Sequence, residues 1–166
     1  MELKVGRLCP TREEDISACL AIYNTYIQNT TITFEEEPLS MPVFTARVHR
    51  ITEQYPFFLA KSGEKVLGYA YLDRYHERSA YRCTADLSVY LAQDARGHGA
   101  GTRLYEAIEE AGRAMGLHSI VSIITGENTV SMCFHEKMGF CRVGKIAEAG
   151  LKFGRRLDVF FYQKLL

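Results

Sequence analysis

Residues 84–116 read TADLSVYLAQDARGHGAGTRLYEAIEEAGRAMG and decide the fold. Alternating apolar and polar residues over 83–91 predict a strand, and amphipathic spacing over 102–115 predicts a helix that Gly116 ends. Between them stand Gly97, Gly99 and Gly101. Glycines let backbone N–H groups approach a phosphate closely, and the start of a helix adds a favourable dipole. The stretch therefore predicts a phosphate-binding turn, with a plain flexible turn as the alternative.

The spacing of these glycines narrows the kind of ligand. It is GxGxG rather than the GxGxxG of dinucleotide-binding folds, and no GKS or GKT follows it. The motif alone therefore favours neither a dinucleotide nor a nucleoside triphosphate.

The flanking sequence predicts the remaining elements. Before the strand over 83–91 we expect a short strand ended by Pro10, helices over 11–28 and 40–55, and a hairpin of two strands. Thr11 and Glu14 suggest a capping box at the first helix. After Gly116 we expect a buried strand at 119–124, a helix that Asn128 caps, and two closing strands over 142–147 and 157–162. The order βααβββαβαββ, without linker or repeat, predicts one α/β domain over residues 1–166, with a mixed central sheet flanked by helices.

The composition of the chain excludes several classes of function. The chain has 166 residues, about the length of one domain, and its 20 basic residues balance its 20 acidic residues. A nucleic-acid binder or a polybasic membrane anchor would carry a basic excess, so neither is expected. The start of the chain is charged where a signal peptide needs an apolar run, and no stretch is long and apolar enough to span a bilayer. We therefore expect a cytoplasmic protein with a small-molecule or protein partner.

The five cysteines are odd in number and include no CxxC pair, which favours buried, reduced thiols. The spacing of Cys133, His135 and Cys141 fits no standard zinc pattern, so no metal site is predicted.

Two sequence blocks carry a family resemblance. Arg96-x-x-Gly99-x-Gly101 follows the strand ending at Leu91, and Asn128 precedes the block 134–140, FHEKMGF. In order and separation these blocks resemble the Gcn5-related N-acetyltransferase superfamily. The resemblance implies an acetyltransferase fold with acetyl-CoA as cofactor. The residues implied to bind this cofactor are Val89, Tyr90 and Leu91 along the strand, Arg96, the turn residues Gly97, His98, Gly99, Ala100, Gly101 and Thr102, and Asn128.

A narrower resemblance covers nearly the whole chain. The segments 33–38 (TFEEEP), 81–90 (YRCTADLSVY) and 150–158 (GLKFGRRLD) are similar to the phosphinothricin and methionine-sulfone acetyltransferase family. This similarity implies acetyl transfer to the amine of a small amino-acid analogue, a resistance-type activity and a homodimer. Two positions depart from the family pattern: Arg156 stands in place of a frequent tryptophan, and Asp86 in place of glutamate.

Acetyl transfer needs a base for the amine and a proton donor for the leaving thiolate. Asp86 and Ser88 share one face of the predicted strand by alternation, so we expect Asp86 to accept the ammonium proton, directly or through water. An ordinary ion-pairing aspartate is the alternative. His135 stands near a position where the superfamily often has a tyrosine, which suggests a general acid; packing against the cofactor is its alternative.

Substrate recognition is expected from cationic and aromatic residues around the thioester. Arg78 and Arg82 are expected to clamp a carboxylate, with His76 nearby. Lys152 and Arg155 are expected to form a second cationic wall, and Phe34 and Tyr81 an apolar one. Two other functions stay open: N-acetylation of another amine (a polyamine, an aminoglycoside or a protein N-terminus), and a non-catalytic acetyl-CoA sensor.

Overall fold

The computed structural model describes residues 2–166 and contains one seven-stranded sheet in the order β1-β2-β3-β4-β5-β7-β6. The strands are β1 (Leu3–Arg7), β2 (Phe57–Ser62), β3 (Lys65–Arg74), β4 (Thr84–Leu91), β5 (Ser119–Thr125), β6 (Cys141–Lys152) and β7 (Arg155–Leu165). Only β4 and β5 pair in parallel; every other neighbouring pair is antiparallel. The sheet is therefore mixed, as the sequence predicts.

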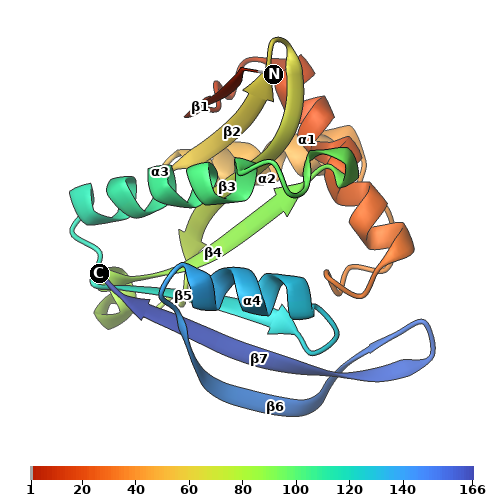
Figure 1. Cartoon of the computed structure of the whole chain (residues 1–166), viewed down its shortest axis with the longest axis vertical. Helices are drawn as coiled ribbons and strands as arrows, with labels where there is room; N and C mark the ends of the chain where they lie inside the picture. The colour runs from red at the N-terminus through yellow and green to blue at the C-terminus, as the bar shows by residue number, and fades with distance from the viewer. Residues whose placement is uncertain (1) are drawn as a thin grey trace.

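Four α-helices cover the sheet: α1 (Glu13–Asn29), α2 (Met41–Thr52), α3 (Ala100–Ala114) and α4 (Thr129–Lys137). Short 3-10 helices at Ser79–Cys83 and Gln93–Ala95 flank β4. Helices α3 and α4 lie on the face of the sheet turned to the viewer in Figure 1. The observed order of strands and α-helices, βααβββαβαββ, matches the predicted order.

Each face of the sheet has its own core. Alternate side chains of β3 point to opposite faces of the sheet. Ala70 and Leu72 pack with Leu104 and Ile108 of α3, whereas Tyr69 packs with α1 and α2 on the other face. This separation follows from the period of two along a strand. Residue 86 of β4, two positions before Ser88, shares the face of Tyr69 and Tyr71, because Tyr71 pairs with Ser88.

Several local expectations need correction. Helix α1 begins at Glu13 after Arg12, and no side chain caps it; Thr11 Oγ1 contacts Cys9 Sγ instead, at 3.1 Å. The β-branched segment 29–34, whose composition predicts extended backbone, is the end of α1 followed by an irregular loop. All five cysteines are free, but Cys19 alone is buried, so the expectation of buried thiols is wrong for the other four.

The closing hairpin is much longer than the sequence suggests. Strands β6 and β7 continue to Lys152 and from Arg155, so that only Phe153 and Gly154 turn between them. In Figure 1 this hairpin reaches beyond the rest of the sheet. Register shifts interrupt β6 twice and divide its apolar pattern, which explains why its full length is hidden in the sequence.

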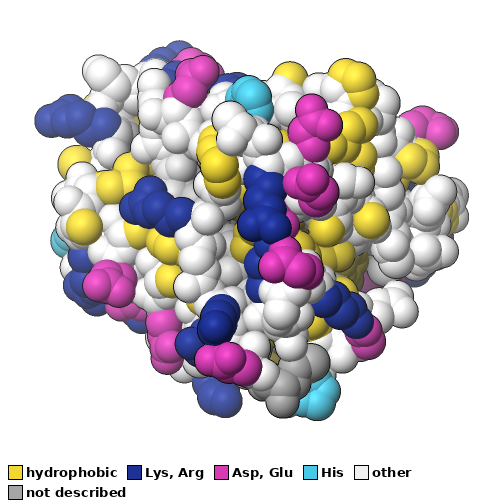
Figure 2. All heavy atoms as spheres, turned by 90° about the horizontal axis from the view of Figure 1, so that it is seen from above, with side chains coloured by type: hydrophobic (Ala, Val, Ile, Leu, Met, Phe, Trp, Pro, Cys, Tyr) yellow, Lys and Arg dark blue, Asp and Glu magenta, His cyan; other side chains and the backbone are white. Residues whose placement is uncertain are grey.

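The surface agrees with the balanced composition. On the face seen in Figure 2, basic side chains lie among acidic ones, with hydrophobic side chains between them. None of the helices within residues 2–166 combines the length and apolar character that a membrane crossing requires.

Candidate active site

The site begins where two parallel strands separate. Strands β4 and β5 pair only from Thr84 to Asp86, opposite Ser119 to Val121, and then diverge. At the divergence the Leu87 carbonyl accepts a hydrogen bond from Ser122 Oγ at 3.4 Å instead of a strand bond. Because backbone groups alternate along a strand, the peptide groups of Val89 point towards β5 like those of Leu87, but no β5 residue pairs with Val89. The edge of β4 is therefore open beyond Asp86.

A cavity of about 820 Å³ occupies this opening. Its walls come from β4, the glycine turn, the end of α1 and the start of α4. Among the predicted cofactor residues, those that line it are Val89, Leu91, Arg96, Gly97, Gly99, Ala100, Gly101, Thr102 and Asn128. Two predicted cofactor residues do not: Tyr90 turns its ring into the aromatic cluster with Tyr23, Tyr26 and Tyr69, and His98 is an exposed turn residue.

The glycine turn leaves space for a ligand. Gly97 and Gly99 adopt φ angles of 78° and 80°, a left-handed conformation that favours glycine. A Cβ at either position would meet no atom within 4 Å. Helix α3 starts directly after Gly99, so its first N–H groups have no acceptor within the helix and point towards the cavity mouth. The turn therefore has the features of an anion-binding site.

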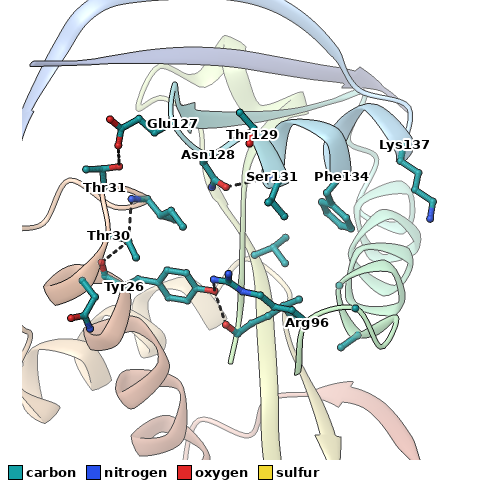
Figure 3. A pocket seen from close by; sticks show the side chains of 18 of the residues that line it. Tyr26, Thr30, Thr31, Arg96, Glu127, Asn128, Thr129, Ser131, Phe134 and Lys137 are labelled. Carbon is teal, nitrogen blue, oxygen red and sulfur yellow. Dashed lines mark hydrogen bonds between the residues drawn. The ribbon is translucent and has the colours of Figure 1, made fainter. Parts of the chain in front are cut away.

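One wall is fixed by a residue that the sequence did not suggest. Tyr26 of α1 donates a hydrogen bond to the Leu91 carbonyl at 2.6 Å and accepts one from Arg96 at 3.0 Å. Figure 3 shows Tyr26 and Arg96 facing each other across this wall. Tyr26 falls on the apolar stripe of α1, so its spacing indicated only a core residue.

The opposite wall comes from the junction of β5 and α4. Glu127 accepts a hydrogen bond from Thr31 Oγ1 at 2.8 Å and pairs with Arg155. The Arg155 hydrogen bond lowers the pKa of Glu127. Asn128 caps α4, as predicted, because its side chain accepts from the Ser131 N–H at 3.2 Å. The cap aims α4 so that Phe134 and Lys137 line the cavity (Figure 3).

Asp86 stands at the point of divergence. It is the last β4 residue paired with β5, and on its other side it pairs with Asp73 of β3. Burial raises the pKa of Asp86 to about 7, and the neighbouring Asp73 carboxylate adds to the rise. Asp86 is not among the residues that line the large cavity. A carboxyl group with this pKa can exchange a proton near neutral pH.

His135 is placed differently from a proton donor in the cavity. Its side chain is 4% exposed, and its two ring nitrogens lie 2.7 Å from the Ser131 carbonyl and 2.9 Å from Ser122 Oγ. Burial lowers the pKa of His135. The structure does not bring this imidazole to the cavity, so its position supports neither a general acid nor packing against the cofactor.

Lys152 was expected to form a wall of the substrate pocket, but it is 1% exposed. Its Nζ donates hydrogen bonds to the carbonyl oxygens of Ile27 and Thr33, at 2.8 and 2.9 Å. Burial lowers the pKa of Lys152. The side chain thus ties the closing hairpin to the end of α1 and to the loop after it.

We predict that Lys152→Met lowers the free energy of unfolding by about 2–3 kcal/mol, because two buried carbonyl acceptors lose their donor. The matched control is Lys145→Met on the same strand, where an exposed ion pair with Asp158 contributes below about 1 kcal/mol. Urea denaturation measures both. If Lys152→Met has unchanged stability but a raised KM for carboxylate-bearing amines, Lys152 contacts the substrate, as the sequence predicts.

The other predicted substrate residues do not form one cluster. Arg155 lines the large cavity. His76 and Tyr81 make edge-to-face contacts with Tyr75, and His76 lines a second cavity of about 510 Å³ beside Asp73. Arg78 and Arg82 are exposed at the 3-10 helix before β4. Phe34 lies against Gly150 of the closing hairpin, where a Cβ would come within 2.3 Å of its ring.

Eleven cavity residues besides Tyr26 were not predicted from the sequence, among them Thr31, Glu127 and Phe134. Glu127 directly precedes the cap Asn128, and Phe134 belongs to the block that carries the resemblance, so adjacency was an available signal for both. Thr31 is brought in only by folding of the loop.

The fold and the cavity define a protein that binds an extended, phosphate-bearing cofactor along an open strand edge. The profile of the family described as Acetyltransferase (GNAT) domain matches residues 9–161. An L-methionine sulfoximine/L-methionine sulfone acetyltransferase from Pseudomonas aeruginosa is 37% identical over 151 residues, which cover 90% of this chain and 88% of that protein. A phosphinothricin N-acetyltransferase from Alcaligenes faecalis is 36% identical over 93% of this chain and 80% of its own length.

Solved structures agree with these sequence matches. A phosphinothricin acetyltransferase from Sinorhizobium meliloti in complex with acetyl-CoA superposes with a TM-score of 0.92 and 31% identity, covering all of this chain and 89% of its own. The chain belongs to the GNAT acetyltransferase family, whose cofactor is acetyl-CoA. The open space at Gly97 and Gly99 and the unpaired edge at Val89 fit this cofactor.

Proposed function

We propose that the protein is an acetyl-CoA-dependent N-acetyltransferase acting on the amine of a small amino-acid analogue of the phosphinothricin, methionine sulfoximine or methionine sulfone type. One observation carries the proposal: a carboxyl group with a pKa of about 7 stands where β4 leaves β5 and the cofactor cavity opens. The relatives named above support the substrate class.

Each part of the site has a task in this reaction. Acetyl-CoA supplies a thioester whose carbonyl carbon accepts the amine and whose thiolate leaves. The amide groups from Gly97 to Thr102 would hold its phosphates, and the open edge at Val89 and Leu91 would bind its arm. The cavity residues Tyr26 and Arg96 keep that edge in place through the Leu91 carbonyl.

Asp86 acts as the base. The α-amine of an amino acid is mostly protonated near neutral pH and must lose a proton before it attacks. We assign this proton to Asp86 through a water molecule, with Ser88 two residues further on the same face as a second polar group. Arg78, Arg82 and His76 are the proposed contacts for the carboxylate of the substrate, and Tyr81, whose ring contacts His76, for its apolar part. Phe34 lies apart from them, against Gly150.

Release of free thiol from acetyl-CoA tests the function. The panel contains L-phosphinothricin, L-methionine sulfoximine and L-methionine sulfone beside spermidine, kanamycin and a peptide with a free N-terminus. We expect turnover in the first three. Turnover confined to the second set would contradict the substrate class, and binding of acetyl-CoA without turnover of any amine would favour the sensor.

We also propose that a second copy of the chain covers the face of β5, β7 and β6 opposite α4. Ile123 and Ile146 are each 49% exposed on this face, where they pair with Phe161 and Val159 of β7. Exposed large apolar side chains on one face of a sheet favour an interface there.

For this homodimer we predict that Ile146→Glu reduces the mass in light scattering from two chains to one. Val43→Glu, which changes an exposed apolar residue of α2, should leave it at two. A single-chain mass for the unsubstituted protein at micromolar concentration would contradict the dimer.

A further inference from the structure

An ion pair behind the proposed base is not used by the function described so far. Arg50 of α2 binds Asp73, the last but one residue of β3, with both arms of its guanidinium, at 2.9 and 2.7 Å. Asp73 pairs directly with Asp86 across β3 and β4. Directly opposed residues share a face and bring their Cβ atoms to about 4.5–5.5 Å, so the two carboxyl groups are neighbours.

The two carboxyl groups differ in their partners. Asp73 has a bidentate guanidinium partner in Arg50. Among the described residues no cation pairs with Asp86. Two neighbouring carboxylates resist carrying two charges, so the proton goes to the one without a cation. The raised pKa of Asp86, to which Asp73 contributes, agrees with this arrangement.

The other charged groups near Asp86 largely neutralise one another. Arg47 of α2 forks onto Glu35 of the preceding loop, at 3.0 and 2.6 Å, and Glu35 also accepts from Tyr23 of α1. Beside the second cavity, Arg74 pairs with Glu77 at 3.1 Å.

Three other titratable groups lie around Asp86: Tyr71 of β3, Tyr90 of β4, and His76, which follows β3 and lines the second cavity. The residue that pairs with Asp86 on β5 is the apolar Val121. Burial raises the pKa of Tyr71 to about 12 and that of Tyr90 well above its ordinary value, so both stay neutral. The Arg50–Asp73 pair is therefore the charge pair in direct strand contact with Asp86.

We propose that Asp73, clamped by Arg50, is a positioning residue that sets the proton affinity of Asp86 and thereby the pH range in which the enzyme works. The mechanistic part rests on the proposed role of Asp86 as base. The two partners act with opposite sign: the Asp73 charge favours the protonated form of Asp86, and the Arg50 charge opposes it.

Because the charges of Asp73 and Arg50 act on Asp86 in opposite directions, the variants Asp73→Asn and Arg50→Gln test the proposal. Both side chains are partly exposed beside the second cavity, so neither change leaves a buried hole. The carboxyl carbon of Asp86 is followed by NMR against pH in the protein without cofactor or substrate, and Asp86→Asn assigns its signal. We expect the midpoint to fall by about one pH unit in Asp73→Asn and to rise by about half a unit in Arg50→Gln. The double variant should lie between them.

Kinetics separate this inference from the proposed function. The acid limb of log kcat/KM should move with the NMR midpoint in each variant. If the midpoints move in the NMR titration while the kinetic profile stays fixed, Asp73 controls the proton affinity of Asp86, but Asp86 is not the base and does not set the pH range of the enzyme. Unmoved midpoints, or displacements in the same direction for both variants, would overturn the inference.

Discussion

Replacing Asp86 by asparagine is expected to lower kcat/KM for the best amine substrate about 100-fold at pH 7.5, the usual contribution of a general base. The amide keeps the shape of the side chain but cannot accept the proton. In the unsubstituted enzyme kcat/KM should rise with pH through about 7, because Asp86 must be ionised to act. Steady-state kinetics from pH 5.5 to 9 measure both effects.

Asp86→Glu is the matched control, since it keeps the carboxyl group and adds one methylene. It should retain most of the activity. An Asp86→Asn enzyme with the unsubstituted rate at every pH would remove the base from the mechanism. A Glu variant as slow as the Asn variant would show that the exact reach, rather than the proton affinity, limits the reaction.

The same pKa has a consequence for stability. The pKa of Asp86 is raised to about 7 in the folded protein from an ordinary value of 3.8, so the folded state holds a proton that the unfolded state has lost between these values. The contribution of Asp86 to stability is therefore complete below pH 3.8 and is lost as pH rises to about 7. Thermal unfolding should show Asp86→Asn gaining stability relative to the unsubstituted protein between pH 5 and pH 8.

Gly99→Val is expected to weaken the binding of acetyl-CoA at least tenfold, or about 1.4 kcal/mol. Gly99 has a φ of 80° directly before α3, and a β-branched residue resists this conformation. The added side chain also fills the space through which backbone N–H groups reach a phosphate. Isothermal titration with acetyl-CoA gives the dissociation constant.

The matched control lies at the other end of the same helix. Gly116 has a φ of 77°, and a Cβ there also meets nothing within 4 Å. Gly116→Val should therefore lose a similar stability, about 1–2 kcal/mol, while its affinity for acetyl-CoA stays unchanged. Equal affinities of the two variants for acetyl-CoA would show that the cofactor phosphates do not bind at the glycine turn.

The glycine turn and the order of elements were readable from the sequence because they depend on local chemistry. The stop at Gly116, the cap at Asn128 and the alternation of Asp86 and Ser88 each involve residues within a few positions of one another. The nine predicted cofactor residues that line the cavity lie on such local features. Tyr90 does not line the cavity because alternate residues of a strand point to opposite faces, and its ring lies on the face opposite α3.

Contacts between segments that are distant in the sequence could not be predicted from it. Lys152 is indistinguishable from a surface lysine until its Nζ meets the carbonyls of Ile27 and Thr33, more than a hundred residues earlier. His135 and Ser122 meet only when α4 docks on β5. Tyr26 reaches Arg96 only because α1 ends at the opening between β4 and β5.

By itself, then, the sequence determined the strand–turn–helix unit, the mixed α/β class and the family resemblance, since periodicity, glycine conformation and capping act over a few residues. The tertiary structure alone decided which polar side chains are buried and which carboxyl groups become neighbours. Asp73 and Asp86 stand thirteen positions apart in the chain, and only the register of β3 against β4 makes them a pair. Strand register is a property of two segments together, so neither segment encodes it alone.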